Sequence, residues 1–128
     1  MNTENMAVCE TLETSFEAIA RKWGSEIYPL DIKKINPMQS IRLKCQVPLC
    51  EYSGVCKTCP PHIPDVAVFR EALLSYSKAI LVVLQEKIKN IDDYRTDFSA
   101  ELKLADIVSD LELAAFQHGF YQALGLGV

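Results

Sequence analysis

Four of the five cysteines of this chain are crowded into one short segment, at Cys45, Cys50, Cys56 and Cys59. Their spacing is C-x4-C-x5-C-x2-C, and a Pro-Pro pair follows the last of them. Thiolate sulfur is a soft ligand that suits iron–sulfur clusters, zinc and copper(I). Four such ligands complete either a tetrahedral zinc site or the coordination of a 4Fe–4S cluster. The segment is therefore the first candidate for chemistry in the sequence.

The spacing of the four cysteines bears on which metal they would hold. Structural zinc sites usually pair two short knuckles that are separated by about a dozen or more residues. Here only Cys56 and Cys59 have knuckle spacing, and all four thiols come from one continuous loop. The proline directly after Cys59 also resembles ferredoxin-type runs, in which proline follows the last ligand. The spacing favours an iron–sulfur cluster of the 4Fe–4S type, with zinc as the alternative.

Disulfides, or four unrelated structural cysteines, are the competing explanations. Disulfides are the default in secreted domains, but the N-terminal stretch MNTENMAVCETLE is polar and acidic and does not look like a signal peptide. The longest apolar run, Ala79 to Leu84, is far short of the roughly 20 residues that cross a bilayer. We therefore expect a cytoplasmic protein without a membrane partner. Clustered cysteines in that compartment more often bind metal or do redox work than form disulfides.

Three other side chains deserve comparison with this loop. Cys9 lies on the apolar stripe of a predicted helix, so we interpret it as a core residue. His62 is close to the Pro-Pro pair and is an alternative ligand, although a solvated loop histidine is the favoured interpretation. His118 falls on a helix stripe and is interpreted as a hydrogen-bonded histidine of the interior. We find no Walker motif, nucleophile–base motif or paired catalytic carboxylates, so no catalytic residue is predicted.

Length and charge limit the class of protein. The chain has 128 residues, enough for one domain with a real core, and it carries a net charge of −4. An acidic chain is a poor general binder of nucleic acid, because phosphate neutralisation requires an excess of lysine and arginine. The cysteine segment differs from this average, since Arg42, Lys44 and Lys57 outnumber Glu51 there. Cations near thiols favour the thiolate form that binds metal.

The elements before the cysteines must position them. Apolar residues at three- and four-residue spacing predict a helix over Glu4 to Trp23, and Gly24 stands where a C-cap glycine would end it. Partial alternation predicts a strand over Ile27 to Ile35. A second alternating run, Ser40 to Cys45, predicts a half-buried strand that would carry Cys45 to the rim of a sheet.

The elements after the cysteines complete the expected fold. Asp65 is placed to cap a helix over Val66 to Ser77. Ala79 to Leu84 predicts a strand buried on both faces, packed centrally between the first and last helices. A long helix or a broken pair is expected over Asn90 to Leu124. Its apolar stripe is Leu104, Ile107, Leu111, Ala114, His118 and Tyr121, and the acidic residues at its start are Asp92, Asp93 and Asp97. This order predicts an α/β or α+β domain: a small mixed sheet with flanking helices and a βαβ-like unit after the cysteine-rich loop.

The chain resembles a known family from about Asp31 onward. The resemblance is to the domain-of-unknown-function family 2284, whose members are described as predicted metal-binding proteins. The spaced cysteines, the CPP motif, the helix–strand sequel FREALLSYSKAILVV and the later stretch FQHGFYQALGLG occur in the same order. The loop residues that carry it are Arg42, Lys44, Cys45, Cys50, Tyr52, Gly54, Cys59, Pro60, Pro61 and Pro64. The resemblance implies a metal or iron–sulfur centre, with Cys45, Cys50 and Cys59 on the family cysteines and Cys56 as an addition.

Two functions follow as hypotheses. In the first, the chain holds an iron–sulfur cluster and acts as a redox or electron-transfer accessory that docks to a larger enzyme. In the second, it is a zinc-stabilised interaction module without redox or catalytic activity. Similar members of the family continue past the ALGLG stretch into a second cysteine-rich segment. We therefore expect a single domain over residues 1–128 that is a C-terminally shortened version of a longer member.

Overall fold

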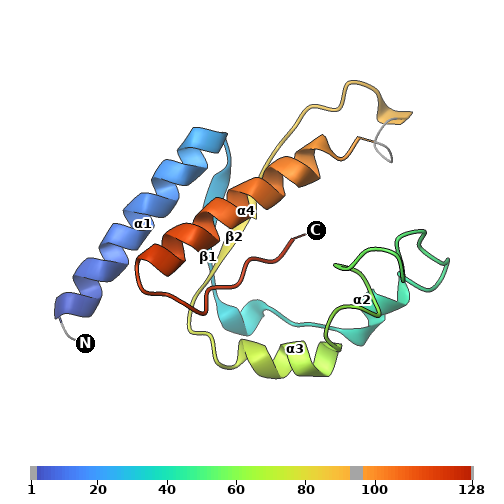
Figure 1. Ribbon diagram of the computed structural model, residues 1–128, viewed down its shortest axis with the longest axis horizontal. Helices are drawn as coiled ribbons and strands as arrows, with labels where there is room; N and C mark the ends of the chain where they lie inside the picture. The colour runs from blue at the N-terminus through green and yellow to red at the C-terminus, as the bar shows by residue number, and fades with distance from the viewer. Residues whose placement is uncertain (1–2, 93–96, 128) are drawn as a thin grey trace. The chain divides into compact units, whose positions relative to one another are not determined.

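The structure is a computed structural model that describes residues 3–92 and 97–127, with side-chain burial given from residue 11 onward. Helices alternate with two short strands along these residues (Figure 1). The elements are α1 (Thr3–Trp23), β1 (Glu26–Leu30), the 3-10 helix η1 (Ile32–Lys34), α2 (Gln39–Leu43), α3 (Val66–Leu73), β2 (Ala79–Val83) and α4 (Ser99–Gln117). The predicted mixture of helices with a small sheet is confirmed.

The chain divides into two compact units. The helical unit comprises residues 1–28 and 80–128, and the cysteine unit comprises Pro29–Ala79. The cysteine unit is thus inserted between the two halves of the helical unit in the sequence. The single domain expected over residues 1–128 stays a prediction.

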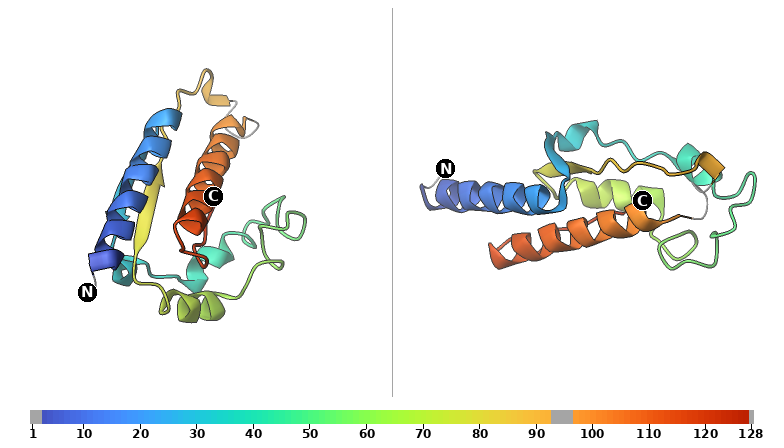
Figure 2. Two further views of the ribbon diagram at one scale, coloured as in Figure 1. Left: turned by 60° about the vertical axis from the view of Figure 1, so that its left-hand side comes forward. Right: turned by 90° about the horizontal axis from the view of Figure 1, so that it is seen from above.

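The helical unit is built on the packing of α1 against α4, which lie side by side in Figures 1 and 2. Its buried residues come from the contact between these two helices: Ala20, Ile107, Leu111, Ala114 and Ala115. Three of them belong to the stripe predicted for the last helix. At the end of α1, the indole Nε1 of Trp23 donates a hydrogen bond to Asp110 Oδ2 at 2.9 Å. Phe16 and Trp23 are half-buried, so the helix pair covers these aromatic rings only in part.

The glycine predicted to end the first helix does so. Gly24 follows α1 directly and has a φ of +68°, a conformation that costs glycine little. The Ser25 backbone N–H then donates to the Ala20 carbonyl at 2.9 Å, which satisfies one of the free carbonyls of the last turn.

The sheet consists of β1 and β2, which pair as antiparallel strands. The strand predicted in the apolar run after residue 78 is confirmed, but its expected burial on both faces is wrong. Ile80 and Leu81 keep 38% and 48% of their surface exposed. In the described part of the chain β1 is its sole partner strand, so β2 is an edge strand and not a central one.

The strand predicted over residues 40–45 is also wrong. Residues 39–43 form the short helix α2, and its last turn is continued by hydrogen bonds from the Lys44 and Cys45 N–H groups to the Ile41 and Arg42 carbonyls. A βαβ-like unit requires parallel strands on both sides of a helix. Because this segment is helical and β1 and β2 are antiparallel, that unit is not formed.

The helix after the loop begins at Val66, as predicted, and ends at Leu73 instead of Ser77. Asp65 occupies the N-cap position, but its carboxylate makes no capping hydrogen bond. The last helix, α4, is shorter than the predicted range 90–124. Before it, the Asp97 carboxylate accepts a hydrogen bond from the Ser99 N–H at 3.0 Å, and hydrogen bonds from Ser99 lower the pKa of Asp97.

Asp93, another of the acidic residues predicted at the start of that helix, lies outside the described residues. None of the helices in the described ranges combines the length and the apolar character that crossing a bilayer requires.

Candidate metal centre

The loop over residues 44–64 joins the end of α2 to the start of α3 and carries all four clustered cysteines. Its first part is a tight turn. The Cys50 N–H donates to the Cys45 carbonyl at 3.0 Å, and an isolated antiparallel bridge joins Gln46 to Leu49. A cis peptide bond precedes Pro48 at the tip of this turn. The turn places the backbones of Cys45 and Cys50 next to each other, although four residues separate them in sequence.

A second turn brings Cys56 and Cys59 together. The Cys59 N–H donates to the Cys56 carbonyl at 3.0 Å, and the His62 N–H donates to the Cys59 carbonyl at the same distance. The Pro60–Pro61 bond is cis. The cysteines are therefore arranged as two pairs, each closed by a backbone hydrogen bond, which we call the first pair (Cys45 and Cys50) and the second pair (Cys56 and Cys59).

Further backbone hydrogen bonds form in the segment between the two pairs. Ser53 donates to the Cys50 carbonyl at 3.0 Å, and Cys56 donates to the Tyr52 carbonyl at 3.1 Å. Farther along, Gly54 donates to the Pro60 carbonyl at 2.7 Å, and the loop therefore folds back on itself. The ring of His62 reinforces this return, since its Nε2 lies 3.2 Å from the Gly54 carbonyl oxygen and donates to it.

The four thiols are chemically suited to a metal but do not surround a common point. All four are free and half-buried. In the described ranges, no group of three or more histidine, cysteine, aspartate or glutamate side chains is arranged to hold a metal ion. Four thiols are a donor set that fits a thiolate-bound metal or cluster. The two pairs would have to move closer together for all four sulfurs to bind one centre.

Tyr52 stands between the pairs in sequence and interacts with a thiol from each. Its pKa is raised, first by desolvation of the phenol and then by the charges of Glu51, Cys56 and Cys50. Tyr52 as a whole nevertheless keeps 37% of its surface exposed.

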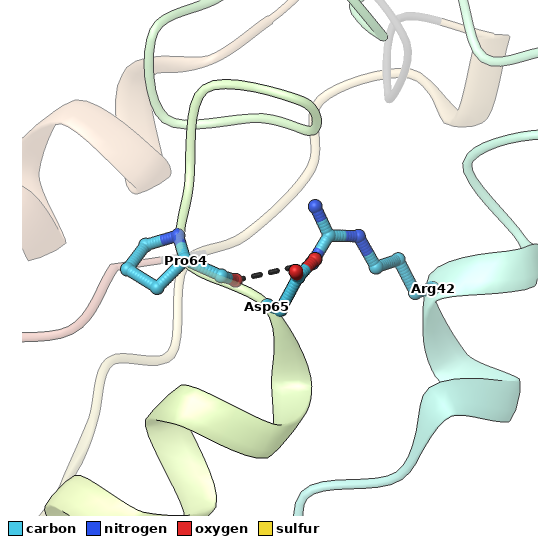
Figure 3. A network of polar contacts seen from close by, with 3 residues as sticks. All are labelled: Arg42, Pro64 and Asp65. Carbon is cyan, nitrogen blue, oxygen red and sulfur yellow. Dashed lines mark hydrogen bonds and ion pairs between the residues drawn. The ribbon is translucent and has the colours of Figure 1, made fainter.

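Arg42 has a structural role in this region that its local sequence pattern does not indicate. Its side chain is only 14% exposed although it carries a charge. Its Nη1 donates to the Pro64 carbonyl at 3.1 Å and to Asp65 Oδ1 at 3.2 Å (Figure 3). The arginine precedes the loop and both of its partners lie at the loop's end, so one side chain ties the two ends together.

The remaining candidates play smaller parts. His62 is exposed, as expected for a loop histidine, and its Nε2 is already engaged by Gly54. His118 is half-buried and its Nδ1 lies 2.7 Å from the Ala114 carbonyl oxygen, which agrees with a hydrogen-bonded structural histidine. The predicted core position of Cys9 falls on a side chain outside those described.

The cysteine unit has no core of its own. Every residue of Pro29–Ala79 is described, and none of these residues is buried. Large aliphatic side chains on the loop itself are among the most exposed in the molecule, with Val47, Leu49 and Val55 at 75%, 77% and 73%. Turns and polar contacts hold the unit together, and apolar packing contributes little to it.

A family comparison agrees with metal binding. Residues 28–128 match the family described as predicted metal-binding protein (DUF2284), and the chain belongs to this family. The match includes the whole cysteine unit and continues to the last residue. No curated protein and no solved structure matches the chain.

Proposed function

We propose that the chain binds its metal through Cys45, Cys50, Cys56 and Cys59. The observation that carries this proposal is the pairing of four free, half-buried thiols by two backbone turns, in a unit without a buried core. Domains that are too small to bury a sufficient core are commonly stabilised by metals or disulfides. The family to which the chain belongs is a predicted metal-binding one, which supports the same conclusion.

Metal binding would supply the stabilisation that packing does not. Gathering four thiolates costs loop entropy and brings like charges together, and a shared cation offsets both costs. Each turn already brings the backbones of two of these cysteines together. A four-sulfur site further requires that the two pairs approach each other.

We propose that the bound group is an iron–sulfur cluster of the 4Fe–4S type and that the protein is a redox or electron-transfer accessory of the cytoplasm. The support is the continuous cysteine loop that ends on a proline, which is more typical of cluster-binding loops than of zinc sites. A protein in this role would pass electrons to or from a redox enzyme that docks on it.

Zinc is the second candidate, and one observation favours it. The Cys56–Cys59 turn combines the two-residue spacing of a zinc knuckle with a closing backbone hydrogen bond. A zinc-bound form would be an interaction module without redox activity.

Anaerobic purification followed by metal analysis and a visible spectrum tests the proposal. A brown protein with broad absorption and stoichiometric iron and sulfide supports the cluster, whereas a colourless protein with stoichiometric zinc supports the zinc module. Changing Cys45, Cys50, Cys56 and Cys59 singly to serine should sharply lower the metal content. Cys9→Ser is the control and should retain it. Full metal occupancy in all four loop variants would contradict the proposal.

A further inference from the structure

The two ends of the cysteine loop are joined by polar contacts in both directions. From α2, Arg42 reaches the start of α3, where it bonds to the Pro64 carbonyl and the Asp65 carboxylate. From α3, Arg70 reaches back and donates through Nη2 to the carbonyl of Pro37, just before α2. Each helix that borders the loop therefore contributes an arginine to the segment that leads into the other helix.

These two arginines form what we call the loop brace. Arg42 is the more enclosed of the two, since its side chain is only 14% exposed whereas Arg70 is an exposed residue. Both of its bonds come from one guanidinium nitrogen, Nη1, which carries two N–H groups and lies between the Pro64 carbonyl and the Asp65 carboxylate (Figure 3). The acceptors are one backbone carbonyl and one carboxylate, so the contact survives in part when either of them is lost.

We infer that Arg42 is a positioning residue for the proposed metal centre, which it serves by holding the ends of the loop together before metal arrives. The inference rests on the proposed function. Arginine carries only donors and stays protonated, so Arg42 itself is not a ligand. Its effect is to remove part of the entropy cost of closing the loop, because the ends are fixed and only the segment between them must rearrange.

Affinity for a spectroscopic metal measures this effect. Metal-free protein is titrated with Co(II) and with Zn(II) in competition with a chromophoric chelator, for the wild type, Arg42→Lys, Arg42→Gln and Asp65→Asn. Loss of the two charge-assisted bonds should weaken binding by about tenfold or more in both Arg42 variants. Asp65→Asn retains the Pro64 contact and should cost about threefold. The Co(II)–thiolate absorption should keep its wild-type bands throughout, because the ligands are unchanged.

Two further readouts separate positioning from charge and from general damage. Lys57→Gln removes one positive charge from the loop without touching the brace, so it measures the effect of charge alone and should weaken binding clearly less than Arg42→Gln does. Arg42→Lys keeps the charge, but its ammonium nitrogen stands one bond nearer the backbone than Nη1 and does not reach both acceptors, so it should not restore affinity. In metal-free Arg42→Gln, amide hydrogen exchange should accelerate over residues 44–64 and stay unchanged in α4.

The outcomes are distinguishable. If the wild type binds Co(II) through thiolates and the Arg42 variants bind it equally well, the inference is overturned while the proposed function stands. Equal weakening by Lys57→Gln, or full rescue by Arg42→Lys, would assign Arg42 a purely electrostatic role and also overturn it. If the wild type binds neither Co(II) nor Zn(II) through its cysteines, the proposed function fails and the inference fails with it. Because Asp65 is exposed, Asp65→Asn keeps the test informative even if an Arg42 variant does not fold.

Discussion

The two units of this protein are stabilised by different means. The helical unit has a small buried core where α1 meets α4, centred on Ile107, which has no exposed surface. The cysteine unit has no buried residue in Pro29–Ala79 and depends on turns and on arginine side chains that reach carbonyls and a carboxylate. Burial of apolar side chains therefore stabilises the helical unit. The cysteine unit lacks this interaction, which usually dominates folding.

This difference indicates where a metal would matter. In the helical unit a bound ion would add little to a contact that is already packed. The cysteine unit carries four free thiols in two pairs and has no buried residue. Since metal binding and folding share one free energy in small metal-binding domains, we expect the stability of the two units to respond differently to metal and to mutation.

The largest expected effect is that of metal removal. Stripping metal from the loaded protein with a chelator should strongly lower amide protection over residues 44–64 and leave α4 protected, because the proposed metal ligands all lie in the cysteine unit. Hydrogen exchange measured by mass spectrometry before and after chelation provides the test. Equal loss of protection in α4 would show that the two units do not differ in this way.

A core truncation should have the next largest effect, and on the other unit. Ile107→Ala removes a fully buried side chain from the α1–α4 contact and should lower the free energy of unfolding by about 2–5 kcal/mol. The matched control is Ile41→Ala in the cysteine unit, where the side chain is 60% exposed and the change should stay within about 0.5 kcal/mol. Denaturant unfolding compares them, and similar costs for both would remove the distinction between the units.

A smaller effect is expected where the C-terminal segment crosses α4. Gly125 donates its N–H to Glu112 Oε2 at 2.7 Å, and a Cβ at this position would lie only 2.5 Å from Val108 Cγ1. Gly125→Ala should therefore destabilise the helical unit by about 1–3 kcal/mol without changing the metal content. Gly127→Ala is the control, since nothing lies within 4 Å of its added Cβ, and thermal unfolding should show no loss there. A stable Gly125→Ala would mean that the segment is not held against α4.

The longer periodic elements were predictable because their patterns repeat over several turns. The first helix, its terminating glycine and the stripe of Ile107, Leu111 and Ala114 all follow from spacing alone. The start of α3 at Val66 was predicted for the same reason, together with a residue suited to the N-cap. The predicted capping bond is absent, and the Asp65 carboxylate accepts a hydrogen bond from Arg42 across the loop instead.

Short segments were not predictable in the same way. Residues 40–45 alternate like a strand, but five or six residues fit a helical turn equally well, and α2 formed there. The burial of these side chains also differs from that of a half-buried strand whose apolar side chains face inward. Ile41 and Leu43 are 60% and 54% exposed, while the side chain of Arg42 is mostly covered. A distant carbonyl and carboxylate make that position favourable for a cation, and no local pattern reports them.

The sequence by itself determined the donor chemistry, the family and the helical core of this protein. Residue types and local spacing are sufficient for those, because soft thiol ligands and a 3.6-residue apolar repeat have the same physical meaning in any fold. The tertiary structure alone decided that the four cysteines stand as two turn-closed pairs, that β2 is an edge strand and that Arg42 spans the base of the loop. Each of these depends on hydrogen-bond partners brought together by the folded backbone, some of them more than twenty residues apart, and such partners leave no periodic signal in the chain.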